Sequence, residues 1–319
     1  MVNARSAPDE RDLEILAVLR AASTNVSGQT LAERFGISRV ALWKRIQQLR
    51  GYSYRIQGGS RGYRLLEEDV VVPWAFPDGA TAVYLSETFS TMDAAWRLAE
   101  SGASAGTLVI ADRQSAGRGR QGRAWCSPGG GLYLTLVLRP RLPSSHAACL
   151  ALEGACALLA WLETTHGCHL DFHWPNDLMA QGRKVGGLLV ELAGSVEDPR
   201  FYLLGLGVNL HAVDLPDRAS SGLADLISHP PLRRDLATDF RERMMAWAKK
   251  PVLRPREWER PCTQLARSVV LQDWQGREIT GVARGFDDHG GLILADANTV
   301  TTFLPGEARR VRLARGADA

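Results

Sequence analysis

The sequence predicts a multidomain protein of mixed α/β (α+β) class, with a helical N-terminal segment, a central domain of alternating strands and helices, and a β-rich tail. The 319 residues are enough for two or three domains of ordinary size. Basic residues concentrate in the first 66 positions, where eleven Arg or Lys face five Asp or Glu, whereas the remaining 253 residues carry a net charge of −3. The spacing of apolar residues also changes along the chain, which indicates separate folding units.

The amino-acid composition is typical of a soluble globular protein. The hydrophobic content of 45% and the charged content of 23% are ordinary for a soluble globular protein. The five cysteines, at positions 126, 149, 156, 168 and 262, form no CxxC pair, which is typical of a reducing compartment. Because the sequence shows neither an uninterrupted run of 18 apolar residues nor a signal-peptide core, we expect a cytoplasmic protein without a membrane segment.

The first 66 residues are predicted to form a winged helix-turn-helix. One helix with apolar residues at helical spacing covers 12–20, and a second begins near Ser27. Gly36 should end the second helix because glycine accepts a positive φ without a steric penalty, and Ser38 should cap a third. The following sequence YRIQGGSRGYRL is typical of two short strands around a glycine-rich turn, which would be the wing.

The third helix is expected to divide its side chains between a buried face and a DNA-binding face. Four apolar residues should point inward: Val40, Leu42, Ile46 and Leu49. The residues left for base edges and phosphates are Ser38, Arg39, Trp43, Lys44, Arg45 and Gln48, with Arg61 and Arg64 on the wing. The basic excess and the wing favour operator DNA binding through residues 27–64 over a helical module that binds no DNA.

The rest of the chain alternates and then becomes purely β. A linker is predicted over 67–78, and the following runs predict a mixed α/β domain: TLVIAD (107–112), LYLTLVLRP (132–140), a helix over 146–164, LLVEL (188–192), FYLLGLGVNL (201–210) and a helix over 233–249. The tail has short β-branched runs separated by Gly and Asp, which predict a small SH3-like β-barrel. We therefore expect domains at 1–66, 67–261 and 262–319.

The segment GRGRQGRAW, residues 117–125, is called the basic loop below. Its arginines offer forked donors to phosphate or carboxylate oxygens, its glycines let a backbone approach a ligand, and its indole can cover a flat ring. Arginine-glycine segments also bind RNA, and no GK[ST] follows that would make this a Walker loop. Because the loop lies between two predicted strands, a small-molecule site is favoured over an RNA-binding tail.

Two further stretches have the same character. HWPNDLMAQGRKVGGLLVE (173–191) places Lys184 before a Gly-Gly pair, and LGLGVNL (204–210) places two glycines and an asparagine at the end of a strand. A lone lysine is usually a solvated hairpin residue, but the glycines that follow Lys184 favour a place in a site. The cluster HGCHLDFH (166–173) matches no standard zinc spacing, so we expect no metal site built from protein ligands alone.

Taken in order, GRGRQGRAW, WPNDL, KVGGLLVE and GLGVNL resemble the motifs of the biotin–protein ligases. The winged helix before them and the β-barrel after them resemble the bifunctional bacterial form, which is both biotin ligase and biotin operon repressor. The resemblance covers nearly the whole chain and implies a central domain similar to class II aminoacyl-tRNA synthetases. It implies that biotin and ATP, with Mg²⁺, form biotinyl-5′-adenylate and pyrophosphate. The adenylate would then acylate one lysine of the biotin carboxyl carrier protein of acetyl-CoA carboxylase.

The same resemblance implies roles for individual residues. Arg118, Arg120 and Lys184 would stabilise charge where the carboxyl group meets the phosphate. The biotin-binding residues would be Ser90, Thr91, Met92, Gln114, Gly117, Arg118, Gly119, Arg120, Lys184, Gly187 and Gly205. The nucleotide-binding residues would be Arg118, Arg120, Arg123, Trp125, Asn176, Asp177 and Asn209, with Asp177 also a candidate for magnesium.

The sequence departs from the family pattern at two positions. His173 stands before WPND where lysine is common, and Ala124 stands before the loop tryptophan where a basic residue is frequent. The resemblance further implies a homodimer that forms when the adenylate binds and then recognises two operator half-sites. A biotin-sensing DNA-binding repressor without ligase activity and a lipoate ligase are the alternatives. The intact basic loop and Lys184 disfavour the first, and the loop and WPND disfavour the second.

Overall fold

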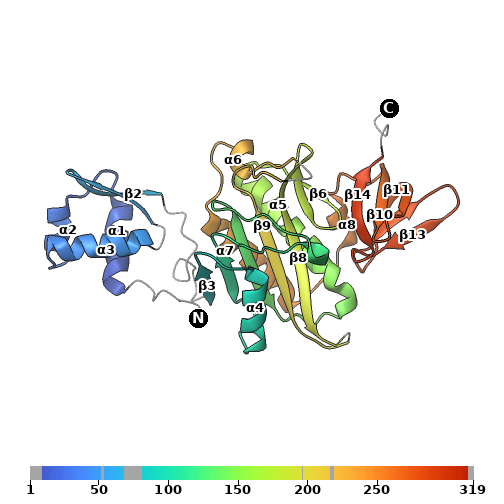
Figure 1. The fold of residues 1–319 in the computed structure, drawn as a ribbon, viewed down its shortest axis with the longest axis horizontal. Coiled ribbons are helices and arrows are strands. Elements are labelled where there is room, and N and C mark those ends of the chain that lie inside the picture. The colour runs from blue at the N-terminus through green and yellow to red at the C-terminus, as the bar shows by residue number, and fades with distance from the viewer. Residues whose placement is uncertain (1–8, 52–53, 68–80, 196, 216–218, 315–319) are drawn as a thin grey trace. The chain divides into compact units, whose positions relative to one another are not determined.

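The computed structural model describes residues 9–51, 54–67, 81–195, 197–215 and 219–314. Its contacts divide the chain into two compact units, one of residues 1–84 with 232–235 and the other of residues 85–231 with 236–319. Figure 1 shows the elements of each unit in chain order. Of the linker predicted over 67–78, only the first residue lies within the described part of the chain.

The N-terminal unit has the predicted helices and wing. Its elements are α1 Glu10–Ala21, α2 Gly28–Arg34, α3 Arg39–Gly51, β1 Arg55–Gly59 and β2 Gly62–Glu67, and the two strands pair antiparallel. Ser27 caps α2 by accepting from the backbone N–H of Gln29, and Ser38 accepts from the N–H of Ala41. Gly36 adopts φ +60°, which confirms the predicted end of α2.

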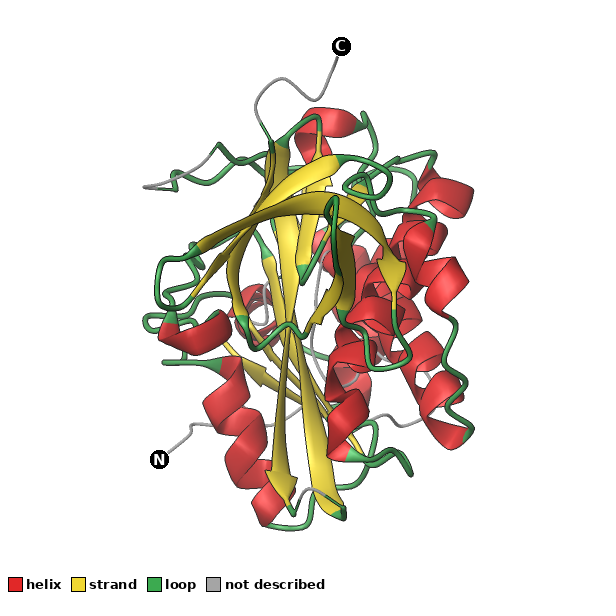
Figure 2. Ribbon diagram, turned by 90° about the vertical axis from the view of Figure 1, so that its right-hand side faces the viewer, coloured by secondary structure: helices red, strands yellow, loops and turns green. Residues whose placement is uncertain are grey.

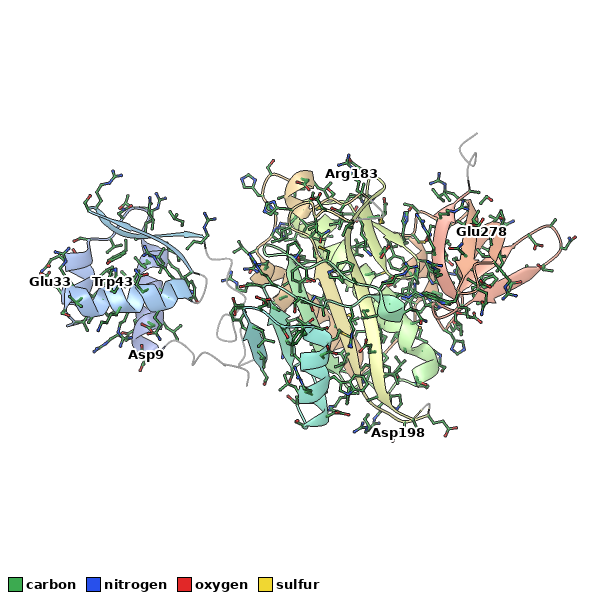
Figure 3. All side chains as sticks on the ribbon, in the orientation of Figure 1. Asp9, Glu33, Trp43, Arg183, Asp198 and Glu278 are labelled. Carbon is green, nitrogen blue, oxygen red and sulfur yellow. The ribbon has the colours of Figure 1, made fainter. Side chains whose placement is uncertain are left out.

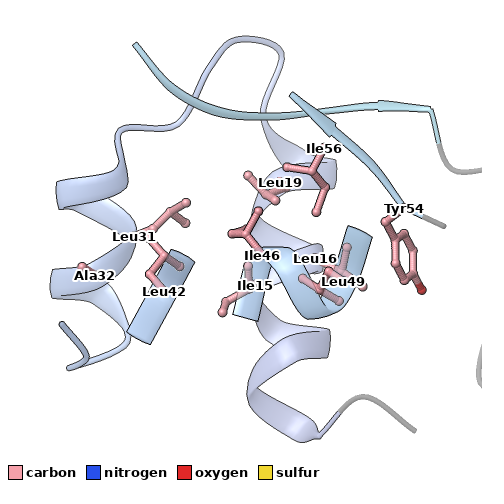
Figure 4. Packing of buried hydrophobic residues seen from close by; sticks show 10 residues of the cluster. All are labelled: Ile15, Leu16, Leu19, Leu31, Ala32, Leu42, Ile46, Leu49, Tyr54 and Ile56. Carbon is pink, nitrogen blue, oxygen red and sulfur yellow. The ribbon is translucent and has the colours of Figure 1, made fainter. Parts of the chain in front are cut away.

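The three helices enclose a common apolar core, in which Leu42, Ile46 and Leu49 of α3 are at most 1% exposed (Figure 4). The prediction for Val40 is wrong, because its side chain is 65% exposed. At 100° per residue, Val40 lies on the opposite side of the helix from Leu42, so it cannot share the buried face. Burial of the other three therefore fixes the face of α3 that remains exposed.

The second unit contains the strands β4 to β9 of a seven-stranded sheet whose order is β3-β4-β5-β9-β8-β7-β6. The strands are β3 Ala82–Leu85, β4 Leu108–Ala111, β5 Leu132–Leu138, β6 Asp171–His173, β7 Asp177–Ala180, β8 Arg183–Gly194 and β9 Pro199–Val208. Along the sheet order β4-β5-β9-β8-β7-β6, every pair of neighbouring strands is antiparallel. The β8–β9 hairpin is the longest, and Arg183 and Asp198 mark its two ends in Figure 3.

Helices pack beside these strands (Figure 2). They are α4 Thr91–Glu100, α5 Ala147–His166, α6 Leu223–Leu226, α7 Arg233–Lys249 and α8 Pro255–Glu259. The stretch Ser144–His166, which contains α5, is long and apolar enough to cross a membrane by length and composition, but 56% of its most apolar window is buried inside the fold. Because α5 packs on β8, β9 and β6, its apolar composition has a place in the core.

A five-stranded antiparallel sheet of order β13-β12-β11-β10-β14 completes this unit. Its strands are β10 Ser268–Asp273, β11 Glu278–Phe286, β12 Leu292–Ala295, β13 Val300–Phe303 and β14 Ala308–Leu313. We call it the C-terminal sheet. Buried Trp174 joins it to the central sheet, because its indole N–H donates to the carbonyl of Gly290 over 3.0 Å and its backbone N–H donates to Gln264 over 2.7 Å.

Candidate active site and DNA-binding surface

A hollow on the central sheet lies under the basic loop. Its floor comes from β5, β8 and β9, and the first turn of α4 and the basic loop contribute to its rim. The lining residues are Thr91, Met92, Gln114, Arg118, Gly119, Trp125, Leu134, Asn176, Gly187, Leu188, Leu189, Gly205, Leu206 and Gly207. The structure therefore brings together site residues that the sequence predicted from separate segments of the chain.

A chain of polar groups runs along one side of the hollow. Gln114 accepts from the backbone N–H of Thr91 over 2.7 Å and donates to the hydroxyl of Ser127 over 2.8 Å. Thr135, which is fully buried, donates to the Thr91 hydroxyl over 2.9 Å. These bonds fix the side chains of Thr91 and Gln114 before any ligand enters, so they present preorganised donors and acceptors to a polar ring.

Ser90 is fully buried and does not line the hollow. Its hydroxyl caps α4 by accepting from the backbone N–H of Met92 over 3.2 Å. The cap holds the first turn of α4, and hence Thr91 and Met92, against the hollow. The structure thus gives Ser90 a positioning contact through the helix terminus.

Glycines keep the floor open at three points. A Cβ on Gly205 would lie 2.8 Å from the sulfur of Met92, and one on Gly207 would lie 2.6 Å from the ring of Trp125. A Cβ on Gly187 would lie 3.2 Å from the same ring. Contacts under 3.0 Å are not tolerated without a shift, so the indole of Trp125 rests on a surface that only glycine leaves free.

The basic loop is an ordered hairpin. Gly119 N–H donates to the carbonyl of Arg123 over 2.7 Å, and Trp125 N–H donates to the carbonyl of Gly117 over 2.8 Å. At its tip, Gln121 and Gly122 both adopt positive φ, of 53° and 71°. A Cβ on Gly117 would lie 2.6 Å from the Trp125 carbonyl, so glycine is needed where the two legs meet.

Lys184 is not among the residues that line the hollow but lies beside Trp125, which does, and only 8% of its surface is exposed. Its ammonium group is 4.6 Å from the centroid of the Trp125 ring and pairs with the carboxylate of Asp177 at 2.5 Å. The cation–π contact and the ion pair hold the charge in one place. The Asp177 carboxylate therefore has a cationic partner in this state.

Arg118 is the arginine of the basic loop that lines the hollow. Its guanidinium pairs with Asp93 at 2.7 Å and with Glu191 at 3.0 Å. Burial raises the pKa of Glu191 above its usual range, although the Arg118 charge opposes the shift. Because Asp93 and Glu191 already pair with the guanidinium, an incoming anion must compete with them for it.

Arg120 and Arg123 are not among the residues that line the hollow. Arg120 donates to the backbone carbonyls of Pro305 and Ala308 in the C-terminal sheet, and the Arg123 guanidinium lies 5.7 Å from the ring centroid of Trp274. Burial lowers the pKa of Arg120 to about 10, so its guanidinium is still cationic at neutral pH. In this state the structure directs both side chains to the C-terminal sheet.

The two asparagines have different surroundings. Asn176 lines the hollow, and its amide donates to the Leu188 carbonyl over 2.7 Å. Asn209 is 3% exposed, outside the lining, where its amide faces the carbonyls of Lys184 and Ser221 at 3.5 and 3.4 Å. Asn209 thus joins the end of β9 to the strand that carries Lys184.

His173 lies on β6, directly before the WPND stretch. Its Nε2 is 2.9 Å from the hydroxyl of Thr263. Burial lowers the pKa of His173, and Asp171 and Asp177 oppose that shift. The imidazole is therefore neutral at pH 7, where a lysine in its place would carry charge.

Two donors in the site have no hydrogen-bond acceptor among the described residues: Nε of Arg118 and Nε1 of Trp125, both buried. Both are donor-only groups, so the chemistry that would satisfy them is an acceptor such as a carboxylate or phosphate oxygen. Within the described ranges, no group of three or more His, Cys, Asp or Glu side chains is arranged to hold a metal ion.

Several contributors to the site were not predicted from the sequence. They are Ser127 and Thr135 in the polar chain and the Arg118 partners Asp93 and Glu191. Gly207 belongs to the predicted LGLGVNL stretch, and the structure adds its contact with Trp125. The carboxylates had no usable signal in the sequence, since their approach to Arg118 depends on how the sheet and α4 pack.

On the N-terminal unit, α3 presents Arg39, Trp43, Lys44 and Gln48 as exposed side chains, and Arg61 and Arg64 are exposed on the wing. Trp43 is 52% exposed and labelled in Figure 3. Arg45 differs, because its guanidinium pairs at 2.7 Å with Asp9 and with fully buried Asp12. Ser38 serves as the helix cap.

Comparison with known proteins agrees with this architecture. The "Biotin/lipoate A/B protein ligase family" matches residues 85–209, and a helix-turn-helix domain family matches residues 11–64. The chain is similar to the "Bifunctional ligase/repressor BirA" of Bacillus spizizenii, with 31% identity covering 86% of this chain and 90% of that protein. It is also similar to the protein of the same name from Escherichia coli, at 29% identity over 88% of this chain and 91% of the relative.

This chain is also similar to a solved structure. The biotin protein ligase of Aquifex aeolicus in complex with biotin and ATP is 27% identical, has a TM-score of 0.62 and covers 73% of this chain and 99% of its own. Fold and site therefore define a protein of the biotin/lipoate ligase class that carries a helix-turn-helix domain. More particularly, the chain belongs to the family of bifunctional biotin ligase/repressors.

Proposed function

We propose that this protein is an ATP-dependent biotin–[biotin carboxyl-carrier protein] ligase and a biotin-responsive transcriptional repressor. In the first step, a biotin carboxylate oxygen attacks the α-phosphorus of ATP, which gives biotinyl-5′-adenylate and releases pyrophosphate. In the second step, the amine of a carrier lysine attacks the acyl carbon, AMP leaves and an amide bond forms. The observation that carries the proposal is the hollow under the basic loop, where two buried donor atoms, Nε of Arg118 and Nε1 of Trp125, have no acceptor among the described residues and Lys184 lies against the Trp125 ring.

The site residues support this chemistry through position and charge. Carboxylate and phosphate are both anions, so they approach only where cations are fixed in advance. Lys184 is held by Trp125 and Asp177, and we infer that its ammonium group stabilises charge at the carboxyl–phosphate centre. Arg118 exchanges its carboxylate partners for the substrate anion. No protein nucleophile is required, because the substrate supplies its own.

Biotin is proposed to bind against the preorganised polar chain. Thr91 and Gln114 hydrogen-bond the ring, and Gly187 and Gly205 give clearance on the floor. The remaining assignments on the biotin side are Ser90, Met92, Gly117, Gly119 and Arg120. Ser90 would act through the α4 terminus that it caps.

The nucleotide is proposed to lie beside Trp125 and Asn176, which both line the hollow. The further nucleotide-side assignments are Arg118, Arg120, Arg123, Asp177 and Asn209. Mg²⁺, when present, would neutralise the ATP phosphates, and Asp177 would be its protein contact. Because Asp177 pairs with Lys184 here, a magnesium role would require that carboxylate to share its charge.

The partners follow from the two activities. The carrier is proposed to be the biotin carboxyl carrier protein of acetyl-CoA carboxylase, and DNA is contacted through residues 27–64. We also propose a homodimer that forms when the adenylate binds, and a cytoplasmic location. The proposed domain limits stay at 1–66, 67–261 and 262–319, with a class II synthetase-like central domain and an SH3-like C-terminal domain. The antiparallel order of the C-terminal sheet supports the last assignment.

One assay tests the enzyme. The full chain is incubated with labelled biotin, MgATP and a carrier domain, and both the adenylate and the labelled carrier are measured. We expect both products. If neither forms, the ligase proposal is wrong; if neither forms while biotin still alters DNA binding, the protein is a biotin sensor without ligase activity.

A variant of the basic loop tests whether Arg118 retains the adenylate in the site. Arg118→Gly removes the guanidinium that lines the hollow, so we expect the adenylate to dissociate more readily and to label bystander lysines. Loss of a hydrogen bond to a charged group is worth about 1.5–3 kcal/mol, which corresponds to roughly 10- to 150-fold faster release. If the variant labels the carrier lysine as selectively as the wild type does, Arg118 does not retain the adenylate.

A further inference from the structure

We propose that Trp274 is a positioning residue for the basic loop. Arg123 lies against the Trp274 ring, and this contact, with the bonds of Arg120 to the 304–308 turn, holds the loop over the activated acyl intermediate until the acceptor amine arrives. The inference rests on the proposed ligase function. It assigns to the C-terminal sheet the retention of the intermediate.

The Trp274 ring is fixed independently of the loop. It is half-buried in the turn between β10 and β11, and its indole N–H donates to the Gly306 carbonyl over 2.7 Å. The preceding residue, Asp273, stabilises the same turn by accepting from the backbone N–H groups of Gln275 and Arg277 over 2.9 and 2.8 Å. Arg123 therefore meets a preformed surface, and docking orders only the loop side of the contact.

The loop side is equally well defined. The Arg123 guanidinium carbon is 5.7 Å from the ring centroid, within the range of a cation–π contact. The backbone carbonyl of Arg123 accepts from Gly119 in the opposite leg of the hairpin. Because the two legs are bonded, holding Arg123 also holds the leg that carries Arg118.

Arg120 binds the same part of the C-terminal sheet. It donates to the carbonyls of Pro305 and Ala308, which flank the Gly306 carbonyl that the Trp274 indole uses. Both arginines of the loop that lie outside the hollow thus converge on residues 304–308 and the indole that is bonded to them. Three other residues of the loop, Arg118, Gly119 and Trp125, line the hollow.

The consequence concerns release of the intermediate. For the loop to open, Trp125 must leave Gly207, and Arg120 and Arg123 must leave the C-terminal sheet. A cation–π contact at an exposed site corresponds to a factor of about 2–5 in an equilibrium or rate. Removal of the ring should therefore speed adenylate release by about that factor, without removing a group that touches biotin or ATP.

The experiment uses the full-length protein loaded with biotinyl-adenylate from labelled biotin and MgATP. After a chase with excess unlabelled biotin and ATP, retained label is followed with time for wild type, Trp274→Ala, Trp274→Leu and Trp274→Phe. We expect release about 2–5-fold faster for Ala and Leu and near wild type for Phe, which keeps an aromatic face. Bystander-lysine labelling should rise in parallel. A Leu variant that retains the intermediate as well as Phe would show that volume, not the π face, matters, and would overturn the proposal.

A double-mutant cycle measures the interaction between Arg123 and Trp274 directly. If Arg123 acts through Trp274, the release rate of Arg123→Ala/Trp274→Ala should equal that of the faster single variant. Additive effects would overturn the contact. The matched control is Arg200→Ala, which removes a guanidinium 5.8 Å from the Phe201 ring, away from the loop, and should leave release unchanged. If wild type forms no adenylate, the ligase function fails; if wild type retains it and every Trp274 variant does too, only this inference fails.

Discussion

A single hydrogen atom at position 207 decides whether Trp125 can lie on the sheet. Gly207→Ala would place a Cβ 2.6 Å from two ring carbons of Trp125 and 2.7 Å from its Nε1. The ring must move, and with it the loop that carries it. Overpacking of this kind costs about 1–3 kcal/mol, so we expect adenylate formation to fall by roughly 5- to 150-fold. Single-turnover measurement of adenylate from labelled biotin and MgATP checks it.

Gly59→Ala is the matched control, on β1 and outside the site. A Cβ there meets no atom within 4 Å. Its rate should stay within about threefold of wild type, a difference of less than 1 kcal/mol. Equal losses in the two variants would mean that the position of Trp125 on the sheet does not limit the reaction.

His173 gives the protein a predicted pH response. Its folded-state pKa lies below the ordinary value near 6.5 because the imidazole is buried. As pH falls below about 6.5, the unfolded chain gains a proton that the folded chain does not, so stability declines. His173→Gln removes this titration. Between pH 7.5 and 5.0, calorimetry should show a larger fall in Tm for wild type than for the variant, by about 2–4 °C per kcal/mol; parallel falls would contradict it.

At the scale of an element, α3 separates structural from DNA-facing cations. Arg45→Ala leaves fully buried Asp12 without its guanidinium partner, so we expect the N-terminal unit to lose about 3 kcal/mol of stability. Lys44 is exposed, and Lys44→Ala should leave the melting temperature unchanged. It should weaken binding to duplex DNA and lower the dependence of log K on log salt by about 1.

The comparison of the two variants is informative in both directions. Salt-dependent binding of a random-sequence duplex is measured beside thermal melting of the same preparations. A stable Arg45→Ala variant with a reduced salt slope would show that Arg45 contacts phosphate and that its pairs with Asp9 and Asp12 are dispensable. If the dependence of log K on log salt is the same for Lys44→Ala as for the wild type, Lys44 contacts no phosphate, and the assignment of α3 as the recognition helix is contradicted.

The N-terminal unit shows which features of a fold can be predicted from its sequence. The helix-turn-helix was predictable because its signals are local: Ser27 and Ser38 cap helices, and Gly36 adopts the positive φ that ends α2. The prediction for Val40 was wrong because an apolar side chain is buried only on the inward face of a helix, and Val40 lies opposite Leu42. The motifs also contain Gly119, Gly187 and Gly205, which line the hollow.

The partners of the charged side chains could not be predicted, because they come from distant parts of the sequence. The pairing of Arg118 with Glu191, 73 residues away, and the bonds of Arg120 to Pro305, 185 residues away, exist only after the sheets have packed. From the sequence, all three loop arginines were equivalent donors for one anion. Tertiary structure separates them, since one faces the hollow and two face the C-terminal sheet.

At the scale of the whole molecule, the ligase site and the DNA-binding unit must be coupled if the protein responds to biotin. The two units are separately compact, so each can be measured on the intact chain. We expect bound biotinyl-adenylate to tighten binding to the chain's operator duplex by about 5- to 150-fold, the usual range of allosteric coupling. Titration of labelled duplex at fixed salt, with and without a non-hydrolysable adenylate analogue, measures this factor.

The same coupling must also appear in the affinity for the analogue, which gives a second test. If the analogue tightens DNA binding by a given factor, saturating DNA must tighten analogue binding by the same factor, because both describe one thermodynamic cycle. If a homodimer mediates the coupling, the factor must also depend on protein concentration. Unequal factors would show that the preparation is not at equilibrium. If neither ligand changes the affinity for the other, the ligase site and the DNA-binding domain are not coupled. Repression would then not depend on whether the adenylate occupies this hollow.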